Sequence, residues 1–222
     1  METISPSKYW YVVEKAGIVL VTMSVIVFVL TFFPVVKEEF KYQLFPKHSD
    51  AVVTTHEAVS KQEQEGRKGT NDIMYPVDED FGIVIPKISA NAVVVPDVDW
   101  RDASVYQRAL TKGVAHAKGT SHPGEMGNVF IFAHSGVDFY EALRYNAEFY
   151  LLSKLAPGDE IYLFYNKEKF TYIVTEKKVV APEEVDYLTG EGTKKTLSLM
   201  TCSPAGTTFK RLLVIASQTE NR

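Results

Sequence analysis

The sequence predicts a mostly β domain, a barrel or a sandwich of short strands, that follows one N-terminal membrane span. Two observations carry this prediction. Residues 16–36 contain no charged side chain, and from residue 81 onward short β-branched runs alternate with turn residues. Regular spacing of short strands with few helices is typical of closed or stacked β architectures.

The uncharged run predicts a transmembrane helix over residues 16–36. At about 1.5 Å per residue its 21 positions (36 − 16 + 1) span roughly 31 Å, the thickness of the hydrocarbon core of a bilayer. Lys15 and Lys37 bound the run, and aromatic residues lie on both sides of it, as interfacial belts do. No small-residue cleavage site follows, so we expect a retained anchor rather than a signal peptide.

The span divides the chain into four parts. Residues 1–15 form an N-terminal segment, 16–36 the span, 37–76 a tether, and 77–222 the folded domain. The middle of the tether is polar and lacks large apolar residues, which is typical of a spacer, although residues 51–65 could form a solvated helix. Lysines are slightly more frequent after the span than before it, so charge alone does not place the N-terminus inside.

Composition excludes some classes of function. The 222 residues are 45% apolar, which is enough for a core, and the formal net charge of −4 gives no basic footprint for nucleic acid. The single cysteine cannot form an intramolecular disulfide. It is therefore a buried apolar residue, an intermolecular partner or a reactive thiol.

The elements of the folded domain follow from local patterns. A short helix is predicted over 102–110, where apolar residues share one face before Gly113, and helical pieces are expected within 139–155. Residues 182–195 are predicted to be a loop. Strands are predicted in runs rich in β-branched and aromatic residues: 82–86, 92–96, 128–134, 160–165, 170–176, 196–202 and 211–216.

Three residues at predicted strand ends suggest acyl-transfer chemistry. Cys202 ends one strand and Arg211 opens the next, with Pro204 and Gly206 in the turn between them, so a hairpin could bring the two together. His134 ends an apolar strand and could carry the proton that a thiol nucleophile requires. A guanidinium is a permanent, forked donor for an oxyanion.

Each of these residues also has an ordinary structural interpretation. A histidine in an apolar run is often a hydrogen-bonded core residue, and an arginine that opens a strand is often solvated. His116 and His122 are rival candidates for the base, whereas His48 and His56 lie in the tether.

The motifs resemble those of the sortases, the membrane-anchored cysteine transpeptidases of bacterial surfaces. Ile85-Pro86-Lys87-Ile88 is similar to the opening strand of the family, and residues 123–134 are similar to its histidine segment. The run from Thr196 through Thr201-Cys202 to Arg211 resembles the T-L-x-T-C signature and its arginine. The signature is stretched, so the match relies on residues 199–202. The short loop between Cys202 and Arg211 is similar to the short-loop classes, such as D or E.

The resemblance implies a closed β-barrel of about eight strands with short helices. It implies that Cys202 is the nucleophile, His134 the acid and base, and Arg211 the stabiliser of the oxyanion, with Thr201 shaping the substrate groove. No cofactor and no metal are expected.

The resemblance also implies a substrate and a location. The substrate is a C-terminal sorting signal of the Leu-Pro-x-Thr-Gly type on a surface protein or pilin, held as a thioacyl enzyme. The acceptor is an amine, such as a peptidoglycan precursor or a pilin lysine. This chemistry lies outside the cytoplasmic membrane, which places the N-terminus inside.

Two other classes of function stay open on sequence grounds. One is a membrane-tethered β domain that only binds, in which the thiol is inert. The other is a cysteine hydrolase that releases its product to water. A calcium site at Glu183, Glu184 and Asp186 is also conceivable, although acids in a loop are usually solvated.

Overall fold

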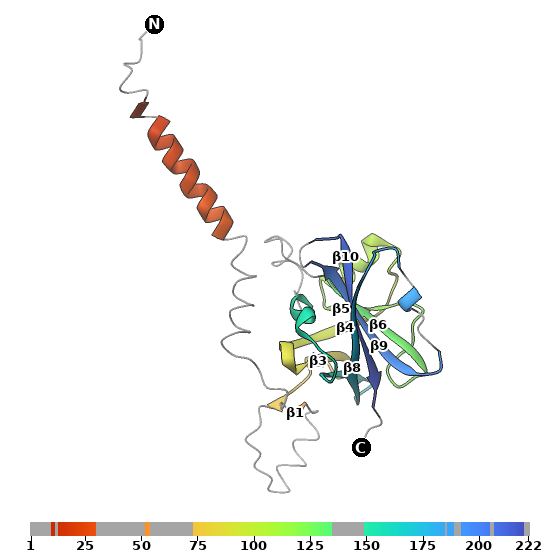
Figure 1. Cartoon of the computed structure of the whole chain (residues 1–222). Coiled ribbons are helices and arrows are strands. Elements are labelled where there is room, and N and C mark those ends of the chain that lie inside the picture. Colours follow the sequence, from red (N-terminus) through yellow and green to blue (C-terminus); the bar gives the residue numbers. More distant parts are fainter. Residues whose placement is uncertain are drawn as a thin grey trace.

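The computed structural model describes residues 10–11, 13–29, 52–53, 73–134, 149–184, 186–188, 192–204 and 207–219. Its main body is a closed barrel of eight strands in the order β10-β8-β7-β3-β4-β5-β6-β9 (Figure 1). The strands are β3 (Phe81–Ile85), β4 (Ala90–Val98), β5 (Val114–Ala117), β6 (Gly127–Phe132), β7 (Glu160–Tyr165), β8 (Glu168–Val180), β9 (Lys195–Ser203) and β10 (Lys210–Gln218). The predicted mostly β barrel is confirmed.

Two of the strand pairs in the barrel are parallel. β4 pairs with β5 and β6 pairs with β9 in parallel, whereas the other neighbours are antiparallel. The parallel pair of β6 and β9 brings together segments about 70 positions apart in the chain. It also places the C-terminal ends of both strands on the same side of the barrel.

The interior of the barrel is apolar. Its largest fully buried side chains come from most of the strands and from the segment before β7, and include Ile83, Ile131, Phe149, Ile161, Tyr172, Leu197 and Leu199. Burial of one such side chain contributes about 1.5–3 kcal/mol. These residues make the barrel a rigid scaffold for the loops at its ends.

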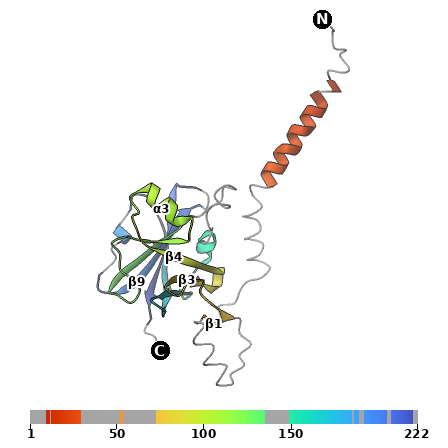
Figure 2. The same ribbon diagram turned by 180° about the vertical axis from the view of Figure 1, so that it is seen from behind.

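The helical elements of the barrel domain are short. α3 (Ala103–Leu110) matches the predicted helix, and it lies at the upper end of the barrel seen from behind (Figure 2). The Asp102 side chain caps it by accepting hydrogen bonds from the backbone N–H groups of Ser104 and Val105. The described part of the barrel domain also contains three 3₁₀ turns: η1 (Pro86–Ile88), η2 (Tyr150–Lys154) and η3 (Asp186–Leu188). Residues 139–148 of the predicted helical stretch lie outside the described residues.

One strand of the barrel was not predicted. β5 has the sequence Val-Ala-His-Ala, which contains only one β-branched residue and therefore gives a weak strand signal. By contrast, the hairpin between β7 and β8 was predicted, and it turns on Asn166 and Lys167, whose φ angles of 49° and 68° match a tight two-residue turn.

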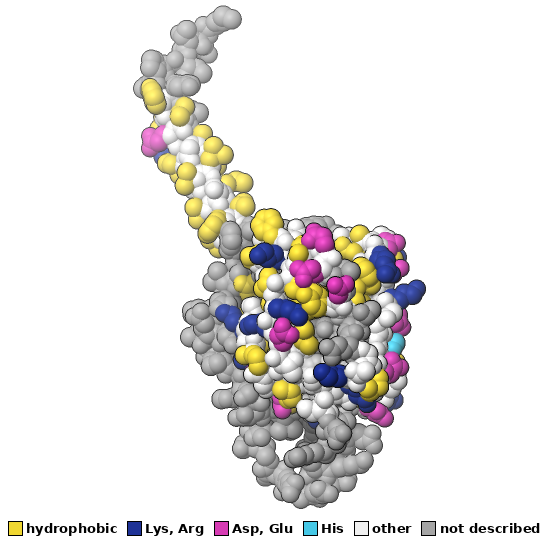
Figure 3. Space-filling view, turned by 45° about the vertical axis from the view of Figure 1, so that its right-hand side comes forward, with side chains coloured by type: hydrophobic (Ala, Val, Ile, Leu, Met, Phe, Trp, Pro, Cys, Tyr) yellow, Lys and Arg dark blue, Asp and Glu magenta, His cyan; other side chains and the backbone are white. Residues whose placement is uncertain are grey.

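The N-terminal region is helical over residues 13–29, and every described side chain in it is exposed. Apolar side chains line this helix in the space-filling view (Figure 3). No helix in the described part of the chain has both the length and the apolar character needed to cross a membrane. Residues 30–36 of the predicted span lie outside the described residues.

Most of the predicted tether, residues 37–76, also lies outside the described residues. Its described pieces are β1 (Val52–Val53) and β2 (Ile73–Met74), which pair in parallel, and the residues after β2. Val53 is buried against Val84, Tyr162 and Phe164 of the barrel. The alternative of a solvated helix from residue 51 is therefore wrong at Val52–Val53, because burial of Val53 favours an extended, docked backbone there.

Candidate active site

Cys202 and Arg211 lie opposite each other on neighbouring strands. They are register partners in the antiparallel pair of β9 and β10, and Nη1 of Arg211 lies 3.6 Å from Sγ of Cys202. The same nitrogen donates to the backbone carbonyls of Thr208 (3.1 Å) and Lys210 (3.2 Å). These carbonyls hold the guanidinium beside the thiol, where a positive charge can stabilise a developing oxyanion.

His134 reaches the same place from the parallel strand pair. Phe132, the last residue of β6, is paired with Met200 of β9. His134 and Cys202 each lie two positions beyond that pair, on adjacent chains that run in the same direction. The register thus delivers an imidazole and a thiol to one end of the barrel.

Thr201 connects these two segments. Its buried hydroxyl donates a hydrogen bond of 3.1 Å to the carbonyl of Ala133, the residue before His134. The backbone N–H of Ala133 in turn donates to the carbonyl of Met200 at 3.1 Å. These two hydrogen bonds connect Ala133, just after the end of β6, to Met200 and Thr201 of β9.

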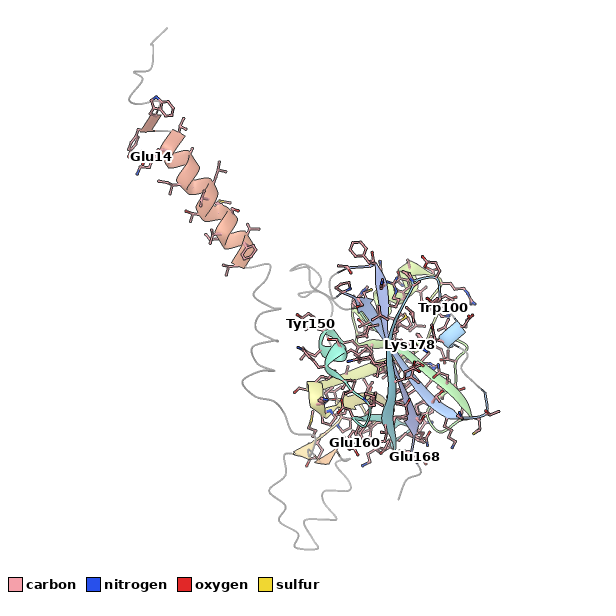
Figure 4. All side chains as sticks on the ribbon, viewed as in Figure 1. Glu14, Trp100, Tyr150, Glu160, Glu168 and Lys178 are labelled. Atoms are coloured by element: carbon pink, nitrogen blue, oxygen red, sulfur yellow. The ribbon has the colours of Figure 1, made fainter. Side chains whose placement is uncertain are left out.

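A cavity of about 460 Å³ contains the three candidate residues and Thr201 in its wall. Much of its wall is apolar and comes from Trp100 in the turn before α3 and from α3, β6, β8, β9 and β10, which supply Tyr106, Leu110, Phe130, Phe132, Val180, Met200 and Leu213. Trp100 lies toward the upper end of the barrel, far from Glu160 and Glu168 at the lower end (Figure 4). The cavity is therefore largely apolar, with a thiol and a guanidinium in its wall.

The loop after β8 forms one wall of the cavity. Its Glu184 carboxylate accepts hydrogen bonds from the backbone N–H of Ala181 (3.0 Å) and from the hydroxyl of Tyr187 (2.9 Å). These bonds, the first of them the larger cause, lower the pKa of Glu184. Lys178 lies 4.5 Å from the ring centre of Tyr187. The Glu184 carboxylate therefore fixes the loop by hydrogen bonds.

Sequence reasoning missed Asn128, which anchors this loop to the barrel. Asn128 is buried at the start of β6 and donates through Nδ2 to the carbonyl of Tyr187 at 2.8 Å. Its Oδ1 accepts hydrogen bonds from the hydroxyls of Thr196 (3.0 Å) and Ser198 (3.1 Å) on β9. A polar amide at the head of an apolar strand was the only signal in the sequence.

The rival histidines lie elsewhere. Neither His116 nor His122 is in the wall of the cavity, and His48 and His56 lie outside the described residues. His116 is completely buried, and burial, together with the neighbouring His122, lowers its pKa. Of the described histidines, His134 is thus the one that shares the cavity with the thiol.

The comparisons with known proteins agree with this geometry. The model of the sortase domain matches residues 83–219, which is more than half of the chain. The chain belongs to the sortase family. The resemblance stated from the motifs is therefore confirmed, and the match covers the barrel except for the first two residues of β3.

Individual sortases are similar to this chain over the barrel. Sortase D of Bacillus subtilis is 29% identical over 133 residues, which are 59% of each chain. The chain thus spans less than two thirds of that relative. The structure of sortase C-1 from Actinomyces oris is 30% identical with a TM-score of 0.56, over 65% of this chain and 75% of that one. A Clostridium perfringens sortase D5 transpeptidase is 25% identical with a TM-score of 0.52, over 73% and 88%.

Proposed function

We propose that this protein is a cysteine transpeptidase. It cleaves a C-terminal sorting signal of the Leu-Pro-x-Thr-Gly type on a substrate protein and joins that substrate to an amine. The observation that carries the proposal is the 3.6 Å approach of the Arg211 guanidinium to the Cys202 thiol, in a cavity that His134 shares. Membership of the sortase family, whose matched region contains all three residues, supports it.

In the first step, Sγ of Cys202 attacks as a thiolate on the carbonyl carbon of the substrate threonine. A C–S bond forms, the carbonyl oxygen becomes an oxyanion, and Arg211 stabilises that charge. The C–N bond to the substrate glycine then breaks. The leaving amine takes a proton from the imidazolium of His134, and a thioacyl enzyme remains.

In the second step, the acceptor amine attacks the thioacyl carbon and His134 takes its proton. The C–S bond breaks, an amide forms, and the Cys202 thiolate and the His134 imidazolium are restored. Protons and electrons balance over the cycle, and no cofactor is required. The apolar wall of the cavity suits the leucine and proline side chains of such a signal.

The partners follow from this reaction. The substrates are surface proteins or pilins that carry the signal, and the acceptor is an amine such as a peptidoglycan precursor or a pilin lysine. We place the catalytic domain outside the cytoplasmic membrane, with residues 1–15 inside, a span at 16–36, a tether at 37–76 and the catalytic domain at 77–222. Two observations support the span: the run of 21 uncharged residues and the exposed apolar side chains of the described helix.

The experiment that tests the function uses the full chain in detergent, a panel of sorting-signal peptides and a soluble amine. A transpeptidase converts the peptide to the amide of the amine, and the share of amide rises with amine concentration. A hydrolase gives only the free acid at every amine concentration. If neither product forms over the peptide panel, the domain is a binding module.

A further inference from the structure

Asp97, His116 and His122 form a second polar cluster, whose ligand atoms all lie within 4.8 Å of one another. Asp97 lies in β4 where the register with β5 shifts, His116 lies in β5, and His122 lies in the loop before β6. None of the three is in the wall of the cavity around Cys202. The cluster therefore has no part in the acyl-transfer site.

The distances in this cluster suit one small cation. Nδ1 of His116 lies 3.6 Å from one carboxylate oxygen of Asp97, and Nε2 of His122 lies 3.7 Å from the other. Ligands at 2.0–2.1 Å from a tetrahedral metal are about 3.4 Å apart. The two distances run to different oxygens of Asp97, and the three ligand atoms lie within 4.8 Å of one another, so binding requires side-chain rotations that bring some of these atoms closer by about 1 Å.

On each histidine, the ring nitrogen that does not face the Asp97 carboxylate faces a hydrogen-bond acceptor. The backbone N–H of Asp97 donates to Nδ1 of His116 at 3.3 Å, so Nε2 carries the proton, and an ion bound at Nδ1 replaces this hydrogen bond. That Nε2 lies 3.1 Å from the carbonyl of Ser121. On His122, Nδ1 faces the Glu125 carboxylate at 3.8 Å. Metal-binding histidines typically donate their second N–H to a carbonyl or a carboxylate, which fixes the tautomer and the ring orientation.

Aromatic packing holds the His122 ring in place. The ring stacks on Tyr165 with centroids 5.2 Å apart, and it lies 4.7 Å from the ring of His116. The backbone N–H of His122 also donates to Glu125 at 2.8 Å. His122 is partly buried, and these contacts lower the entropy lost when the ring binds a ligand.

We propose that Asp97, His116 and His122 bind one zinc ion, with Glu125 as the carboxylate that orients His122. Two imidazoles and one carboxylate suit zinc and similar transition metals, whereas calcium and magnesium prefer sets of oxygen ligands. The ion joins β4, β5 and the loop that enters β6, so its binding stabilises the folded barrel.

The test is calorimetric titration of the tag-free, chelator-treated full chain in detergent with zinc chloride at neutral pH. We expect one zinc per chain in the parent protein and in the Cys202→Ala variant, and a higher thermal midpoint with zinc. His122→Phe keeps a ring on Tyr165 but removes both nitrogens, and we expect it and Asp97→Asn to lower the zinc affinity at least tenfold.

Matched controls separate this site from other sources of binding. Asp99→Asn removes a nearby carboxylate outside the cluster, and we expect it to leave the affinity unchanged. Excess magnesium should not displace the zinc. The proposal is overturned if the parent protein binds no zinc, if His122→Phe binds it as tightly, or if Cys202→Ala abolishes binding, because the thiol would then be the ligand.

Discussion

Arg211 and Cys202 are register partners across β9 and β10, and the guanidinium lies 3.6 Å from the sulfur while two backbone carbonyls fix it. We expect Arg211→Ala to lower kcat/KM for a sorting-signal peptide by roughly 10²- to 10³-fold, as the loss of one oxyanion donor does. Lys210→Ala, at the neighbouring exposed position, is the control and should retain the parent value. Equal effects of the two substitutions would contradict a role in the oxyanion.

Thr201 holds the His134 segment through its hydrogen bond to Ala133. Thr201→Val keeps the shape but leaves that carbonyl without its donor, so we expect a loss of unfolding free energy of about 1 kcal/mol or more. We also expect kcat to fall roughly 10- to 100-fold, because a small displacement of His134 misaligns the proton transfer. Thr201→Ser keeps the hydroxyl and should restore most of kcat. If the serine and valine variants behave alike, the hydrogen bond does not position His134.

The proposed reaction requires Cys202 without its proton and His134 with its second proton. We therefore expect kcat/KM to describe a bell-shaped curve against pH, with the Cys202 thiolate needed on one limb and the His134 imidazolium on the other. Initial rates with a saturating amine over a wide pH range measure the curve. A rate that rises steadily to high pH would exclude His134 as the acid.

Asp102 caps α3, the helix that supplies Tyr106 and Leu110 to the cavity wall. Hydrogen bonds from the side chain and backbone of Ser104 lower the pKa of Asp102. The unfolded chain then binds the proton more readily, so the stabilisation is present above about pH 4 and is lost as the pH falls through the lowered pKa.

Asp102→Asn keeps a capping oxygen but cannot ionise, and it is the matched variant for this pH effect. We expect the parent protein to have the higher thermal midpoint at pH 6 and the difference to disappear in strong acid. A difference that does not change with pH would show that the charge of Asp102 contributes nothing.

The strands and the approach of Cys202 to Arg211 could be predicted because they depend on local patterns. Runs of β-branched residues predicted the strands. Cys202 and Arg211 are nine positions apart with a proline and a glycine in the turn between them, which predicted a hairpin. β5 was missed because its alanines and histidine carry little strand preference.

Other features depend on long-range pairing, which a single sequence does not contain. The hydrogen bond from Thr201 to Ala133 and the anchoring of Tyr187 by Asn128 follow from the parallel register of β6 and β9. The cluster of Asp97, His116 and His122 has no motif spacing, because it forms only where β4 shifts its register against β5. The sequence therefore led us to expect no metal.

The central claim is that Cys202 forms a thioacyl bond with a sorting signal, and intact-protein mass measurement tests it most directly. The full chain in detergent is incubated with a panel of Leu-Pro-x-Thr-Gly peptides without added amine, and Cys202→Ala is the control. We predict an adduct with the mass of the acyl fragment through threonine, located on Cys202, absent from the variant and removed by an amine. A folded protein with a free thiol that forms no adduct with any peptide would contradict the proposal.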